Sequence, residues 1–235
     1  MRHPVDVLRT RLWFHVVKLR SGLRSAYAVE LALEPELVQL HVGGVVRPRK
    51  WDGYASGARV PRRMKGKRYA VEVAEARFPG AATYFDSPIW PVLRGEAVTQ
   101  AWVDSRLRAM SPAILDILLQ QHPIIGDWQF GEFDEERAKR LAELCSFEAL
   151  TAAVLLTTKS ERIASPQLRE LALLTYRQVQ PAIARLIDTA PFADELFWAI
   201  DSVCKHWVFP NPQSRLEVVV FTKSLPEPSN PEEST

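Results

Sequence analysis

Nine Lys or Arg side chains fall within 22 residues of this 235-residue chain, in the stretch RPRKWDGYASGARVPRRMKGKR from Arg47 to Arg68. Cations at this density can neutralise the phosphates of a nucleic acid, and side chains among them can stack on bases or reach base edges. One acid, Asp52, interrupts the stretch, and its three glycines let a partner approach the backbone. The predicted nucleic-acid-binding residues are Arg47, Arg49, Lys50, Arg59, Arg62, Arg63, Lys65, Lys67 and Arg68.

The first part of this stretch has the signals of a short helix that begins at a proline and ends at a glycine. Trp51 and Tyr54 are three residues apart, so they share one face of that helix. We expect this face to point inward. The cations of the same part, Arg47, Arg49 and Lys50, would then lie outside.

The second part of the stretch, Arg59 to Arg68, is called the basic arm below. Nothing in its composition would bury it, so it is the better candidate for phosphate contact. Residues 1–80 carry 16 Lys or Arg and seven Asp or Glu, a net charge of +9, whereas residues 81–235 carry 14 and 21, a net charge of −7. This division suggests that the N-terminal half meets an anionic partner, or the acidic half of a second copy.

We also searched the chain for motifs of catalysis, nucleotide binding and metal binding. The chain has no Gly-rich phosphate loop with its lysine, no Gly-x-Ser-x-Gly turn and no His-x-x-x-His spacing. We therefore expect neither a metal nor another cofactor, and a binding protein in place of an enzyme. His15 lies on the apolar face of a predicted helix and is expected in the core. The acids Glu132, Asp134, Glu135 and Glu136 open a predicted helix, where the helix dipole already accounts for them.

The two cysteines, Cys145 and Cys204, are too few for a disulfide framework, and we expect buried free thiols in a reducing compartment. The N-terminus lacks the uninterrupted apolar run of a signal peptide. No run of about 18 apolar residues occurs, so no membrane partner is expected. These features predict a cytoplasmic protein.

Helical periodicity dominates the chain, with 47% hydrophobic and 25% charged residues. The predicted fold is mainly α, a multi-helix globular protein with an N-terminal helical basic region, a C-terminal helical bundle and minor β content. Strands are expected only near 38–46 and 215–222. The predicted organisation is a basic helical region at 1–85, a linker at 86–97, a helical bundle at 98–222 and a disordered tail at 223–235.

The segment KWDGYASGARVP resembles the end of the recognition helix in helix-turn-helix regulators of the phage-repressor type. That family has the pattern W-x-x-G-x-x-x-P, and here Trp51 is followed by Tyr54, Gly57 and Pro61, so that the glycine falls later. SAYAVELALE would be the first helix of the pair, and PELVQLHVGG lies where the family has a tight turn. The resemblance covers residues 25–61 and implies sequence-specific DNA binding.

These observations predict a nucleic-acid-binding protein with DNA expected ahead of RNA, such as a DNA-binding regulator or an accessory factor of a mobile element or defence system. The alternative is a non-enzymatic helical subunit or adaptor of a larger complex, in which the basic stretch docks on an acidic surface of another protein or of a second copy. A third alternative is an enzyme whose site no motif reveals.

Overall fold

The computed structural model describes residues 2–41, 44–122, 124 and 126–204. This part contains twelve α-helices, two short 3-10 helices and two antiparallel two-stranded sheets, which confirms the predicted mainly-α fold. The strand predicted at 215–222 and the tail predicted at 223–235 lie outside the described residues. No helix in the described part is both long enough and apolar enough to cross a membrane.

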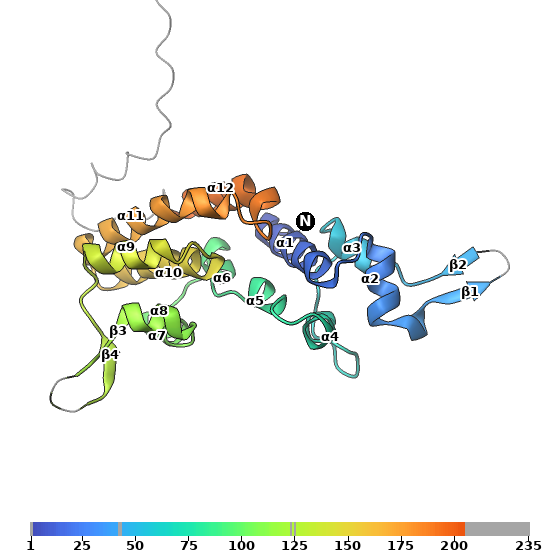
Figure 1. The fold of residues 1–235 in the computed structure, drawn as a ribbon, viewed down its shortest axis with the longest axis horizontal. Helices are drawn as coiled ribbons and strands as arrows, with labels where there is room; N and C mark the ends of the chain where they lie inside the picture. The colour runs from blue at the N-terminus through green and yellow to red at the C-terminus, as the bar shows by residue number, and fades with distance from the viewer. Residues whose placement is uncertain (1, 42–43, 123, 125, 205–235) are drawn as a thin grey trace, which may run out of the picture.

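The elements fall into two groups at the two ends of an elongated molecule (Figure 1). The first group is α1 (Pro4–Ser21), α2 (Ala26–Leu33), η1 (Pro35–Leu37), β1 (Gln39–His41), β2 (Gly44–Val46), α3 (Lys50–Ala55), α4 (Ala70–Arg77) and α5 (Ala82–Phe85). The second is α6 (Ile89–Leu93), α7 (Gln100–Arg108), α8 (Pro112–Leu118), β3 (Leu119–Gln121), β4 (Trp128–Phe130), α9 (Glu135–Glu143), α10 (Phe147–Arg162), α11 (Pro166–Ile183), η2 (Ala190–Phe192) and α12 (Ala193–Cys204).

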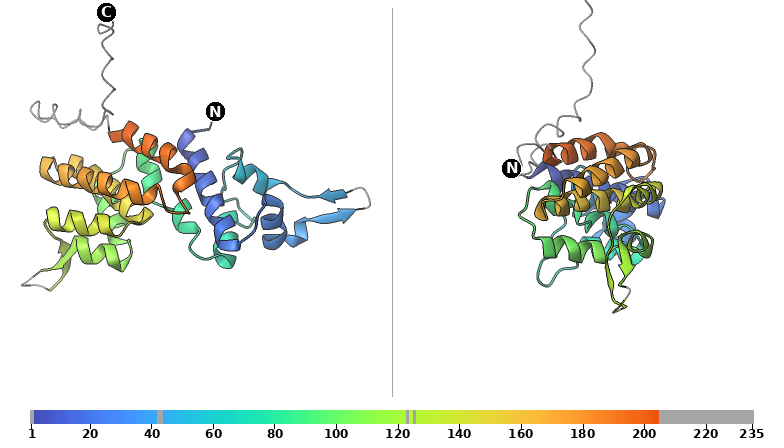
Figure 2. Two further views of the ribbon diagram at one scale, coloured as in Figure 1. Left: turned by 45° about the horizontal axis from the view of Figure 1, so that its top comes forward. Right: turned by 90° about the vertical axis from the view of Figure 1, so that its left-hand side faces the viewer.

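Helix α1 joins two hydrophobic cores. Its first turns place Leu8 and Leu12 in the core of the second group, while Trp13 and Val17 lie in the core of the first. The helix ends at Gly22, which adopts a left-handed φ of 68° and donates its N–H to the carbonyl of Leu19. The basic N-terminal region is therefore anchored on the helical bundle by one continuous helix (Figure 2).

His15 is less buried than predicted. It is half-buried at the junction of the two groups, where its Nε2–H donates to the carbonyl of Ile187 over 2.9 Å. Its ring meets Phe192 edge to face at a centroid distance of 5.5 Å. These contacts give His15 a structural role.

The middle of the segment predicted as a linker, 86–97, lies in the core of the second group, whereas residues 94–97 are exposed. It forms α6, whose Ile89, Trp90 and Leu93 are buried, and the Trp90 Nε1–H donates to the carbonyl of Tyr84 over 2.8 Å. The segment contains Pro88 and Pro91. They lie just before α6 and in its first turn, where a helix does not need a backbone N–H.

Two hairpins project from opposite ends of the molecule (Figure 1). The first pairs β1 with β2 within the predicted strand region 38–46. The second pairs β3 with β4, where the sequence predicts the end of a helix and a loop. Its strands have three residues each, so the pairing depends on contacts between two segments, and no period within either segment reveals it.

Candidate nucleic-acid interface

Helix α3 packs its two aromatic residues inward, as predicted. Trp51 and Tyr54 are buried, and the Trp51 ring lies 5.9 Å from that of Trp13, centroid to centroid. The Trp51 Nε1–H donates to a carboxylate oxygen of Glu34 over 2.8 Å. Tyr69, which directly follows the basic stretch, is buried as well. The three rings are therefore part of the N-terminal core, and of the three only Tyr54 also borders the pocket described below.

Two buried carboxylates beneath α3 bind the first cations of the basic stretch. Glu30 is fully buried and accepts from Arg47 Nη1 over 2.6 Å and from the backbone N–H of Lys50 over 3.3 Å. Arg47 also binds Asp52, and hydrogen bonds to Asp52 and Glu30 raise the pKa of its guanidinium. A buried carboxylate is tolerated only when it is paired in this way.

Lys50 occupies the second of these sites. Its Nζ lies 2.5 Å from an oxygen of Glu34, a residue that is itself buried. The prediction that Arg47 and Lys50 lie free on the outside is therefore wrong. The two buried acids, Glu30 and Glu34, are four residues apart on the α2 side and far from α3 in sequence. Their proximity to Arg47 and Lys50 exists only in the folded chain.

The basic arm is exposed, as its composition predicts, from Arg59 through Arg68 with Pro61 and Val60 turned inward. Two of its cations have acidic neighbours: Arg63 lies 3.0 Å from Glu72, and Arg68 lies 3.3 Å from Glu36. All four of these side chains are more than half exposed, so the pairs hold their charges loosely.

The path of the chain into the arm depends on one glycine. Gly57 has a φ of 72°, and a Cβ at this position would come within 2.5 Å of Val7 on α1. A side chain here would meet both backbone strain and a clash. Gly57 thus allows the chain that follows α3 to pass close to α1 before the basic arm begins.

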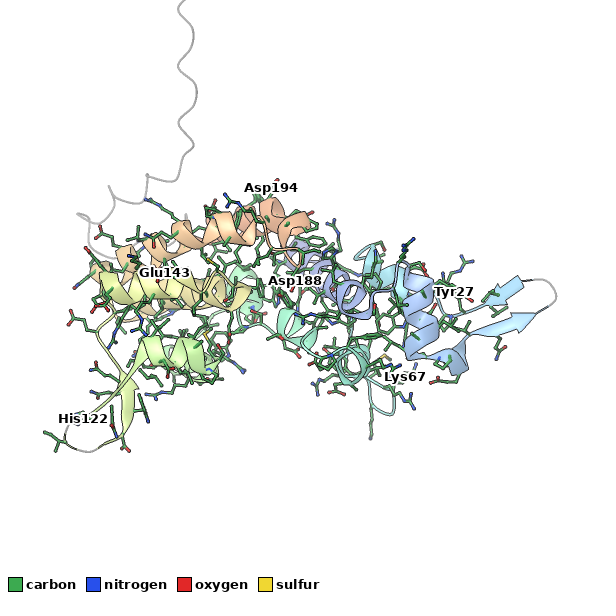
Figure 3. All side chains as sticks on the ribbon, in the orientation of Figure 1. Tyr27, Lys67, His122, Glu143, Asp188 and Asp194 are labelled. Atoms are coloured by element: carbon green, nitrogen blue, oxygen red, sulfur yellow. The ribbon has the colours of Figure 1, made fainter. Side chains whose placement is uncertain are left out.

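An open pocket of about 700 Å³ lies between the arm and the end of α2, and we call it the basic pocket. Figure 3 labels Lys67 at this end of the molecule. Among the described residues, no carboxylate pairs with four of its cations, Arg2, Arg59, Arg62 and Lys67. The cations that line the pocket are Arg2, Lys50, Arg59, Arg62, Lys67 and Arg68.

The structure thus brings five of the nine predicted residues to one pocket and leaves four elsewhere. Arg47 belongs to the buried ion cluster, and Arg63, Lys65 and Arg49 do not line the pocket. Arg49 is exposed at the start of α3 with a left-handed φ of 52°. The pocket also includes a cation that sequence reasoning missed, Arg2. The residues next to Arg2 in the sequence give no signal for a binding site, because Arg2 reaches the pocket only through the packing of the helix that follows it, α1.

The remaining candidate sites have structural explanations. Asp134 caps α9 by accepting from the backbone N–H of Arg137 over 2.9 Å, as the position of the acid cluster predicts. Cys145 is exposed, which corrects the prediction of a buried thiol: it follows α9 in a left-handed turn with φ 46°. The side chain of Cys204 lies outside the described part. Within that part, no three His, Cys, Asp or Glu residues are arranged to hold a metal ion.

A second groove, of about 480 Å³, runs between α1 and α12. Its prominent residue is Trp198, whose exposed fraction of 69% is unusual for so large an apolar side chain. Asp194 and Glu195 flank it, and Glu195 pairs with Arg11 over 2.9 Å.

Comparison of the chain with protein-family models, with curated proteins and with solved structures found no match. We therefore infer a function from the geometry of the basic pocket and of the groove beside Trp198.

Proposed function

We propose that this protein binds nucleic acid, with DNA ahead of RNA, and that the basic arm and the basic pocket hold the phosphates. The observation that carries the proposal is the convergence of Arg2, Arg59, Arg62 and Lys67 on one pocket without a carboxylate partner in the described part of the chain. Like charges gathered in a concavity repel one another, so an anion that enters relieves this repulsion.

The helix-turn-helix resemblance supports DNA as the ligand and stays a prediction. Its two helices correspond to α2 and α3, which pack together. A 3-10 turn and the β1–β2 hairpin stand between them, and α3 has six residues with both of its aromatic side chains inward. The arm that follows α3 is thus the more accessible source of phosphate contacts.

Replacing Arg59, Arg62 and Lys67 by Ala should weaken nucleic-acid binding about tenfold or more near physiological salt. Each cation that binds a phosphate releases counterions from the nucleic acid, and the variant loses this favourable contribution. The slope of log affinity against log salt should become shallower by about 0.9 for each duplex phosphate that the variant no longer neutralises. The measurement is fluorescence anisotropy with single- and double-stranded DNA and RNA over a salt series.

The matched control replaces Lys139, Arg140 and Arg185 by Ala, which removes the same charge from exposed positions outside the basic pocket. Lys139 and Arg140 lie on α9 together with Glu143, which Figure 3 labels at the end of the molecule away from the arm. This control should bind as the wild type does. Weak and equal binding by the wild type and both variants would refute the proposal.

The second candidate function is a subunit of a larger assembly, which the exposed Trp198 and its apolar groove favour. In that case the purified wild type should elute in size-exclusion chromatography with light scattering above the single-chain mass of 26.7 kDa, and Trp198→Ala should elute at that mass. An exposed Ile163→Ala variant is the control and should leave the mass unchanged. A wild type that elutes as one chain in the presence and absence of nucleic acid would exclude self-assembly.

A further inference from the structure

The basic pocket has more in its walls than cations. Leu37 and Met64 line it with large exposed apolar side chains, and Val60 adds a third apolar surface. A site for phosphate alone has no use for these residues. Apolar side chains on two sides of a concave site are what holds the face of an unpaired base.

The pocket also contains two carboxylates, which a pure phosphate site would exclude because they repel the anion. Glu34 is occupied, since Lys50 and Trp51 both donate to it. Glu36 differs: its side chain is 53% exposed and its described partner is Arg68, at 3.3 Å. A carboxylate has about four acceptor positions, so Glu36 retains acceptors for another donor.

The donors that an unpaired base offers include its amino groups, beside the ring N–H groups of thymine and guanine. Cytosine and adenine carry an exocyclic amino group, whereas thymine carries a carbonyl at the equivalent position. Carboxylates in nucleic-acid sites accept from the cytosine amino group. In a duplex the base is paired and stacked inside the helix, so it cannot enter a pocket.

We infer that the basic pocket holds one unpaired nucleotide of a single strand, with an amino-bearing base preferred. The phosphate is bound by Arg59, Arg62 and Lys67, the base lies against the apolar wall, and Glu36 accepts from its amino group. The volume of about 700 Å³ is in the usual range of small-molecule sites, about 300–1,000 Å³. This inference rests on the proposed nucleic-acid binding, and it specifies in addition that the ligand is single-stranded and that the bound base carries an amino group.

The test compares labelled strands of about 12 nucleotides, within the span of known single-strand sites. One strand contains only deoxycytidine, one only thymidine, and a mixed-sequence duplex of the same length is the third probe. The wild type should bind the deoxycytidine strand about three- to tenfold more tightly than the thymidine strand, which is the usual net contribution of one hydrogen bond at a half-exposed position. It should bind the duplex more weakly than the deoxycytidine strand.

Glu36→Ala should abolish the preference for deoxycytidine while overall affinity stays equal or rises, because the variant loses a negative charge and frees Arg68. The matched control is Glu72→Ala, which removes the same charge beside Arg63 but lies outside the pocket. It should keep the preference. Loss of folding would lower affinity for every probe, so it is distinguishable from loss of the preference.

Equal affinity for both strands, or a duplex bound as tightly as the deoxycytidine strand, would overturn the inference. If the arm variant Arg59→Ala/Arg62→Ala/Lys67→Ala still lost binding in that case, the proposed function would stand without it. A wild type that binds none of the probes would overturn both.

Discussion

Trp51→Ala should lower the free energy of unfolding by about 3–5 kcal/mol, the usual cost of removing a large buried aromatic side chain. Trp51 is fully buried, and its ring lies 5.4 Å from Tyr54 and 6.4 Å from Phe14, centroid to centroid. The variant also removes the Nε1–H that donates to Glu34. The measurement is urea unfolding followed by far-ultraviolet circular dichroism.

Two comparisons separate the contributions of Trp51. Trp51→Phe keeps an aromatic ring but loses the donor, so it should cost less than Trp51→Ala yet still leave a Glu34 oxygen with one partner fewer. Trp128→Ala, at a position that is 58% exposed, should change stability by about 0.5 kcal/mol or less. A Trp51→Ala protein as stable as Trp128→Ala would show that α3 does not support the N-terminal core.

Much of the fold follows from signals that act over one or two helical turns. The apolar spacing of α1, its end at Gly22 and the serine caps of α2 and α10 are signals of this kind, because each involves residues within one or two turns of one helix. The inward face of α3 was also predictable, since Trp51 and Tyr54 are three residues apart. The β3–β4 hairpin was not, because its pairing joins two segments that carry no period of their own.

The candidate site likewise has features that local sequence predicts and features that depend on contacts between distant segments. The exposed arm was predictable from composition, since it contains almost nothing that could be buried. The neutralised cations were not: Arg47 and Lys50 bind Glu30 and Glu34, which precede them by 16 to 17 residues. A cation's availability depends on the acids that the fold brings to it, and a count of local charge does not include them. Arg2 is the opposite case: it lies outside the basic stretch in the sequence, and it lines the basic pocket only in the folded chain.

The same ion cluster provides the second prediction: Glu30→Leu should cost about 3 kcal/mol or more of unfolding free energy, because it leaves the half-buried Arg47 with Asp52 alone. The double variant Glu30→Leu/Arg47→Met should recover much of that loss, since it replaces the buried pair by apolar side chains and leaves Asp52, which is 45% exposed, to the solvent. Urea unfolding of the two single variants and the double variant gives the coupling energy between the two positions.

The double variant also separates structural cations from those that meet the ligand. It removes one charge of each sign, so the net charge of +2 is unchanged. If Arg47 serves only to neutralise Glu30, the double variant should bind nucleic acid within about twofold of the wild type with the same salt slope, since it keeps every phosphate contact. A loss of affinity as large as that of the arm variant would instead place Arg47 in contact with the ligand and extend the interface from the arm to α3.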